Sequence, residues 1–220
     1  MTMDNFAITR ARVTDVPAIA SLFTESFMDS VLHHCGGRLP KPQAMEDVFT
    51  LVYTAEPEAA LIAKERSGKL IGYCFAPVRL NQLWIQAITG GHLAKWAWRW
   101  LTGKYGFGLH PVKIIFLNKL AFLRSAATPG KAANARILSV AVSPAARGLG
   151  VASALMAEAD RYFREKQVMR VRLEVRPDNR PAIRVYEKLG YYPGGTTYDS
   201  QGPWLIMFKD FPETGLKTNV

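Results

Sequence analysis

A short glycine-containing segment, residues 147–153, could bind a phosphate group through its backbone. It consists of Arg147, Gly148, Leu149, Gly150, Val151, Ala152 and Ser153. An alanine-rich run with helical spacing follows, so the segment lies where a helix would begin. The first N–H groups of a helix lack internal partners and carry partial positive charge. The glycines would let a phosphate approach the backbone, and the arginine adds a donor group. We call residues 147–153 the anion segment.

A second segment, residues 171–191, contains an acid and a phenol that could move protons. It reads VRLEVRPDNRPAIRVYEKLGY, which predicts a strand, a turn and a helix that stops at Gly190. Glu174 lies in the predicted strand, Asn179 at the start of the helix and Tyr186 within it. A phenol and a thiol have neighbouring pKa values, so a tyrosine suits protonation of a leaving thiolate.

The histidines and cysteines predict no metal site. His33, His34 and Cys35 are adjacent, and adjacent residues on one helix point in different directions. Cys35 and Cys74 form no metal-spaced pair, which favours a reduced, cytoplasmic setting. The first ten residues lack the pattern of a signal peptide.

Hydrophobic periodicity predicts a β-α-α-β-β unit, an insert, and then a β-α-β-α-β-β unit. The predicted elements are strand 6–10, helices from 14 to 31 and from 44 to 53, strands 59–64, 70–75 and 138–142, helix 148–165, strand 171–175, helix 181–189, and strands 191–197 and 205–208. A chain of 220 residues is long enough for one well-buried core and short for two domains.

The insert, residues 80–133, is apolar and basic. Residues 92–102 read HLAKWAWRWLT, with a broad apolar arc opposite Lys95 and Arg99, and a second helix is expected from Pro111 to about Arg124. The net charge is +10, and the chain has no Asp or Glu between Glu65 and Glu158 but twelve Lys and Arg. Such a block attracts anions. The insert could pack on the core as a lid, lie on an anionic membrane surface, or contact a protein partner or a second copy in a homodimer.

Taken together, the two segments strongly resemble the GNAT superfamily of acyl-CoA N-acyltransferases. The loop pattern R/Q-x-x-G-x-G/A and the helix pattern that runs from Asn to Tyr-x-x-x-Gly-Phe/Tyr are matched by Arg147, Gly150, Ala152, Asn179, Tyr186, Gly190 and Tyr191. The second segment is also similar to the ribosomal-protein alanine acetyltransferases, which share its Leu-Glu-Val-Arg strand. The resemblance is sharp over residues 136–192, vaguer over 6–77 and absent over about 80–133.

This resemblance implies an α/β (α+β) fold and an acetyl donor. It implies a single GNAT domain over residues 1–220, with a mixed, mostly antiparallel central sheet flanked by helices and the helical insert between strands 3 and 4. It also implies acetyl-CoA as co-substrate, no metal, and acetyl transfer to a primary amine of a small molecule or peptide by direct attack in a ternary complex. The residues it assigns to the coenzyme are the anion segment, Val140, Ala141, Val142, Asn179 and Tyr186.

The resemblance also implies catalytic roles. Tyr186 would protonate the thiolate, and Glu174 would act as a base through water, since the strand 137–142 contains no carboxylate. Alternatively, solvent would take the proton from the amine in place of Glu174. Asn179 would hold the pantetheine arm, cap its helix, or do both.

Two other functions fit the same residues. One is an acyltransferase that uses a longer acyl-CoA or an acyl carrier protein, with the insert as the acyl pocket. The other is a non-catalytic protein that binds coenzyme A or a membrane surface. If the insert binds a membrane, this cytoplasmic protein would be peripheral to that membrane.

Overall fold

The computed structural model describes residues 6–106 and 133–212. The strands are β1 (Phe6–Arg10), β2 (Ala60–Glu65), β3 (Leu70–Phe75), β4 (Ala135–Arg136), β5 (Ser139–Val142), β6 (Arg170–Val175), β7 (Tyr192–Asp199) and β8 (Gly202–Asp210). The helices are α1 (Val16–Ser26), α2 (Met28–His34), α3 (Pro42–Ala55), α4 (Leu80–Thr89), α5 (His92–Leu101), α7 (Val151–Glu165) and α8 (Arg180–Lys188).

The strands form two four-stranded sheets, with the orders β1-β2-β3-β5 and β4-β6-β8-β7. Only the β4–β6 pair is parallel among the pairs described. The Ile137 N–H donates to the carbonyl of Arg172 on β6, whereas the Leu138 N–H donates to the carbonyl of Phe75 on β3. The chain therefore changes its partner strand between these two residues. Beyond this point β5 is an edge of the first sheet, and one row of its backbone groups is open to a ligand.

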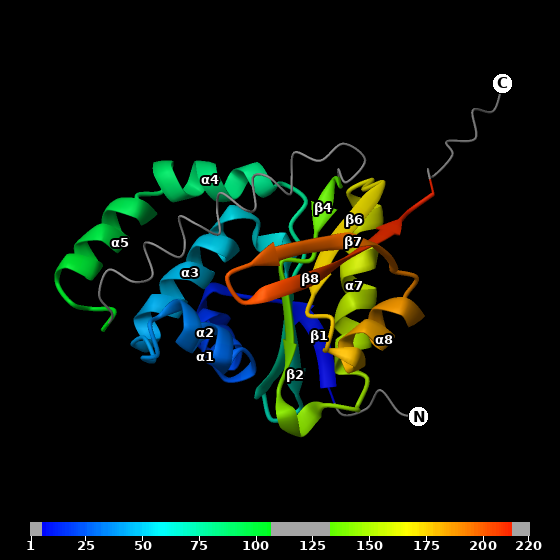
Figure 1. Ribbon diagram of the computed structural model, residues 1–220, viewed down its shortest axis with the longest axis horizontal. Coiled ribbons are helices and arrows are strands. Elements are labelled where there is room, and N and C mark those ends of the chain that lie inside the picture. Colours follow the sequence, from blue (N-terminus) through cyan, green and yellow to red (C-terminus); the bar gives the residue numbers. More distant parts are fainter. Residues whose placement is uncertain (1–5, 107–132, 213–220) are drawn as a thin grey trace.

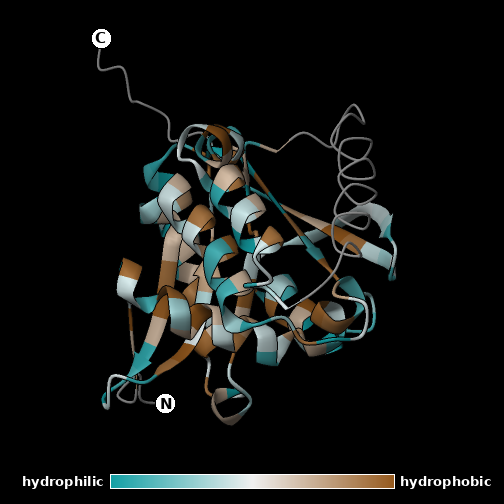
Figure 2. Ribbon diagram, turned by 90° about the vertical axis from the view of Figure 1, so that its left-hand side faces the viewer, coloured by the Kyte–Doolittle hydropathy of each residue, from teal (hydrophilic) through white to brown (hydrophobic). Residues whose placement is uncertain are grey.

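Helices cover the strands on both sides, with α1, α2 and α3 on one side and α7 and α8 on the other (Figure 1). Brown and teal stretches alternate along several helices, as is typical of amphipathic helices (Figure 2). A Cβ at Gly72 on β3 would lie 3.0 Å from Val151 Cγ1 and 3.1 Å from Leu155 Cδ1. The missing side chain thus lets the start of α7 pack close to β3, which fixes the anion segment beside β5.

The predicted mixed α/β fold is confirmed, with four local differences. The structure has two sheets where one was predicted, and the first helix ends at Ser26 and is followed by α2. Neither α4 nor the short strand β4 was predicted. No side chain caps α4, so the usual signal for a helix start is missing there. The second insert helix, expected from Pro111, lies outside the described residues. The assignment of residues 1–220 to one domain stays a prediction.

A buried carboxylate on α3 sets the orientation of α5. The Asp47 side chain is 3% exposed, and its oxygens lie 2.6 Å from Arg99 Nη1 and 3.4 Å from Lys95 Nζ. The hydroxyl of Tyr105 donates to the same carboxylate at 2.7 Å. A buried charge needs partners of opposite charge, so the basic side of α5 faces the protein.

Part of the apolar arc of α5 consequently points away from α3, whereas Trp96 and Trp100 of the same arc are half-buried. Trp98 and Leu101 are 69% and 74% exposed, and Trp84 and Ile88 on α4 are exposed as well. The exposed part of the arc does not pack on the core, because Asp47 binds the opposite side of the helix. The half-buried part fits a lid, and the role of the insert stays a prediction. No helix within the described ranges has the length and apolarity needed to cross a bilayer.

Candidate active site

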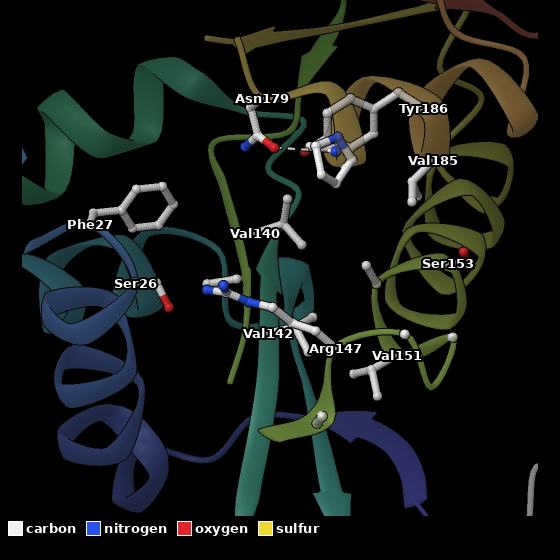
Figure 3. Close-up of a pocket in the computed structure, with 17 residues that line it drawn as sticks. Ser26, Phe27, Val140, Val142, Arg147, Val151, Ser153, Asn179, Val185 and Tyr186 are labelled. Atoms are coloured by element: carbon white, nitrogen blue, oxygen red, sulfur yellow. Dashed lines mark hydrogen bonds between the residues drawn. The ribbon is translucent and has the colours of Figure 1, made fainter. Parts of the chain in front are cut away.

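A cavity of about 490 Å³ lies between β5, the start of α7 and the start of α8 (Figure 3). All but one of the residues assigned to the coenzyme line it: Val140, Ala141, Val142, Arg147, Gly148, Gly150, Val151, Ala152, Ser153, Asn179 and Tyr186. The exception is Leu149, which does not line the cavity and is 59% exposed. The two predicted segments therefore meet at one cavity.

The anion segment has the backbone geometry that an anion site needs. Gly148 and Gly150 have φ angles of +79° and +82°, which side chains other than that of glycine rarely adopt. A Cβ at either glycine would meet no atom within 4 Å, so the space beside the backbone is open. The Ala154 N–H donates to the carbonyl of Gly150, and no side chain caps α7. The N–H groups from Gly148 to Ser153 are thus left for a ligand, whereas that of Arg147 donates to the carbonyl of Pro144 at 3.3 Å.

The opposite wall of this cavity comes from the end of α1. Ser26 and Phe27 line it, and Figure 3 shows the Arg147 side chain pointing toward them. The sequence pattern did not identify these two residues, because no motif connects the end of α1 with residues 147–153. Ala182 and Val185 were also missed, although their spacing from Asn179 places them on one face of α8.

Asn179 is the N-cap of α8. Its Oδ1 accepts a hydrogen bond from the Ala182 N–H at 3.2 Å, as the dashed line in Figure 3 marks. The expected capping role is therefore present in the structure. The side-chain amide N–H₂ of Asn179 remains the group that would reach a pantetheine arm.

Next to this cavity lies a second one, of about 740 Å³. The two share Ser26, Phe27, Val140, Asn179, Ala182 and Tyr186. Tyr186 is 8% exposed and stands at this junction. Burial raises the pKa of its phenol above the ordinary value, and nearby Cys74 raises it further. The phenol therefore stays protonated at neutral pH and can donate a hydrogen bond.

Glu174 lines the second cavity but not the first. Its Oε1 lies 2.5 Å from Arg172 Nε, and its Oε2 lies 2.5 Å from Arg136 Nη2. All three side chains are largely buried. Arg136 and Arg172 are paired in register across β4 and β6, so Glu174 bridges two neighbouring cations. A carboxylate oxygen has two lone pairs, so each oxygen can still accept a bond from water.

The sequence profile of the acetyltransferase (GNAT) family matches residues 17–191. The chain belongs to the GNAT family. The matched residues include β5, the anion segment, Glu174 and Tyr186, so the first cavity lies within the matched region, whereas Gln201 and Trp204 of the second cavity lie beyond it.

Named relatives of this GNAT chain are similar over part of their length. It is 39% identical over 62 residues to a putative ribosomal protein bS18 alanine N-acetyltransferase of Bacillus subtilis, a match to 28% of this chain and 41% of that protein. It is 46% identical over 55 residues to a mycothiol acetyltransferase of Acidothermus cellulolyticus, over 25% of this chain and 17% of that protein. The predicted sequence similarity to the alanine acetyltransferases is thereby confirmed.

A solved structure shares the GNAT fold over almost the whole chain. The ribosomal-protein-S18-alanine N-acetyltransferase of Escherichia coli superposes with a TM-score of 0.55 at 16% identity, covering 98% of this chain and 99% of that one. At this identity the likeness concerns the fold alone.

No group of three or more His, Cys, Asp or Glu side chains in the described parts of this GNAT chain is placed to hold a metal ion. The absence of a metal, like the roles assigned to Glu174 and Tyr186, stays a prediction.

Proposed function

We propose that this GNAT protein transfers the acetyl group of acetyl-CoA to a primary amine of a small molecule or peptide, by direct attack in a ternary complex. The observation that carries the proposal is the position of Tyr186, at the junction of the cavity lined by the anion segment and the larger cavity beside it. A donor in the first cavity and an amine in the second would meet at this phenol.

In this proposal each wall of the first cavity has a task. The N–H groups of the anion segment and Arg147 bind the coenzyme phosphates. The open edge of β5, from Val140 to Val142, pairs with the pantetheine amides and holds the acyl carbonyl. The residues present fit such a ligand, because the backbone at Gly148 and Gly150 faces open space.

The proton steps fall to two side chains. Glu174 receives the proton of the amine through water, while Arg136 and Arg172 hold the carboxylate in place. Tyr186 donates a hydrogen bond to the sulfur as the thiolate leaves. A thiol has a lower pKa than this phenol, so the hydrogen bond stabilises the thiolate without complete proton transfer.

Thermal unfolding with added ligand tests the donor. Saturating acetyl-CoA should raise the melting temperature by roughly 5–16 °C, because a ligand at 100 to 1,000 times its dissociation constant adds roughly 3–4 kcal/mol. Coenzyme A alone should give a shift of similar size, since it carries the same phosphates. A flat response to both at millimolar concentration would exclude the proposed donor.

Replacement Glu174→Gln tests the base. We expect kcat/KM for a verified amine to fall by roughly 100-fold at pH values well below the amine pKa, where a proton must be removed, and to recover at high pH. The measurement is a pH–rate profile of both proteins. If the loss is the same at every pH, Glu174 serves only as the partner of Arg136 and Arg172.

The exposed face of α4 and α5 is proposed to lie on an anionic membrane surface, which would make a cytoplasmic enzyme peripheral to the membrane. Support comes from the exposed Trp84, Trp98 and Leu101 and from exposed cations of the same acid-free stretch that Asp47 does not bind, Arg79 and Lys104. Anionic liposomes should sediment the protein in a salt-dependent manner, and Trp98→Ala with Leu101→Ala should release it without a change in melting temperature. A dimeric mass in solution without sedimentation would assign this face to a second copy instead.

The donor and acceptor classes can be separated by one assay. Thiol release from acetyl-CoA, longer acyl-CoAs and an acyl carrier protein, with an amine panel, distinguishes acetyl transfer from longer acyl transfer. Binding of coenzyme A without thiol release from any donor would favour the non-catalytic alternative.

A further inference from the structure

The larger cavity is lined by carboxylates and aromatic rings and is bounded by hydrogen bonds between α2 and the β7–β8 turn. These features limit which acceptor it can bind. We propose that it takes a compact, positively charged primary amine with an apolar body, and that it excludes an extended peptide. This inference rests on the proposed acetyl transfer, because the same cavity would hold the acceptor.

Two uncompensated carboxylates line the cavity although the protein is basic. The chain has a net charge of +10, and the charged residues that line the cavity are Asp29, Glu174, Arg176 and Asp178. Glu174 is already paired with two arginines. Arg176 is already held by both oxygens of Asp199, at 3.2 Å each. Asp29 and Asp178 are exposed and form no ion pair within the described residues. Their charge is available to attract a protonated amine.

The uncharged part of the lining is mixed: beside polar side chains such as Ser139 and Gln201, it contains apolar side chains and several aromatic rings. It includes Phe23, Phe27, Leu138, Leu173 and Trp204. A volume of about 740 Å³ falls in the range of cavities that hold small molecules, roughly 300–1,000 Å³. The cavity therefore matches an amine whose body is apolar and compact.

A hydrogen-bonded bridge closes the cavity between α2 and the β7–β8 turn. Ser30 Oγ on α2 donates to Gln201 Oε1 in the turn at 2.8 Å, and His33 Nε2 lies 3.1 Å from Ser200 Oγ. Ser30 and Gln201 both line the cavity. Figure 1 shows the turn extending from its sheet toward the side of α1 and α2.

Arg176 ties the bridge to the second sheet. Its Nη2 donates to Gln201 Oε1 at 3.3 Å, and its guanidinium lies 3.8 Å from the centroid of the Trp204 ring. Gln201 Oε1 thus accepts from Ser30 and Arg176 at once. A peptide that left the cavity between α2 and the turn would have to break these bonds, whereas a compact amine would leave them intact.

Three acceptors of one chemical series test the proposal. Phenethylamine is a cation with an aromatic body, phenylalanine adds a carboxylate to the same amine, and a hexapeptide beginning with phenylalanine adds an extended chain. With saturating acetyl-CoA we expect kcat/KM to be highest for phenethylamine, about fivefold or more above phenylalanine because of the added like charge, and lowest for the hexapeptide.

Two variants test the two causes separately. Asp29→Asn with Asp178→Asn should raise the KM for phenethylamine about fivefold with kcat unchanged. The control is Glu25→Gln, which removes an exposed carboxylate of α1 that does not line this cavity. Gln201→Ala should raise kcat/KM for the hexapeptide about tenfold, because two hydrogen bonds of the bridge are lost.

Equal use of the three acceptors, or variants that behave like wild type, would overturn the inference. If no acceptor is acetylated, calorimetry of phenethylamine with wild type and the double Asn variant decides: binding that weakens in the variant supports the inference, and absent or equal binding overturns it. The thermal response to acetyl-CoA reports on the proposed function independently.

Discussion

Gly150→Asp should abolish binding of acetyl-CoA at concentrations that saturate the wild type. The new carboxylate would occupy the open space beside the backbone where the phosphates are proposed to lie. Two like charges about 4 Å apart repel by roughly 1–4 kcal/mol, which raises the dissociation constant roughly 5- to 1,000-fold before any steric effect is counted. Isothermal titration calorimetry measures this change directly.

Gly68→Asp is the matched control for this variant. Gly68 lies in the β2–β3 turn with a φ of +83°, against +82° at Gly150, and a Cβ there also meets no atom within 4 Å. Both variants introduce the same charge and the same backbone strain, so only their positions differ. Wild-type affinity in Gly150→Asp, or an equal loss in Gly68→Asp, would remove the phosphates from the anion segment.

Tyr186→Phe should reduce kcat by roughly 100-fold, the lower end of the loss on removal of one preorganised hydrogen-bond donor, and leave the affinity for acetyl-CoA nearly unchanged. The ring would keep its packing, and only the hydroxyl that donates to the sulfur would be lost. Steady-state kinetics with a verified amine, together with calorimetry of acetyl-CoA, separates the two effects.

Tyr191→Phe provides the comparison. Tyr191 is also buried, its ring centroid lies 6.1 Å from that of Tyr186, and its hydroxyl donates to Asp160 at 3.5 Å. Tyr191 does not line either of the two cavities, so its variant should retain wild-type kcat. Unaltered turnover in Tyr186→Phe would make Tyr186 a packing residue.

Local features of the chain explain why most of the first cavity could be predicted. Phosphate-binding backbone groups at a helix start, and the glycines that expose them, occupy seven consecutive residues. Leu149 was assigned to the coenzyme with its neighbours, but its side chain is exposed and does not line the cavity. Asn179 and Tyr186 were found through the resemblance to the GNAT helix pattern, whose residues lie close together in the chain.

The orientation of α5 shows the limit of a sequence pattern. Residues 92–102 predict an amphipathic helix, but the pattern does not say which of its sides faces the protein. Asp47 on α3 decides this, because a buried carboxylate requires Arg99 and Lys95 on the inner side.

The sequence by itself determined the family, the order of most strands and helices, and the anion segment, because each of these depends on residues that are near in the chain. Only the tertiary structure decided that Ser26 and Phe27 face the anion segment, that Glu174 lies between two arginines, and that Ser30 reaches Gln201, 171 positions away. These contacts depend on how the two sheets separate, after the chain has paired with β6 at Ile137 and then with β3 at Leu138. No local pattern of residues encodes that geometry.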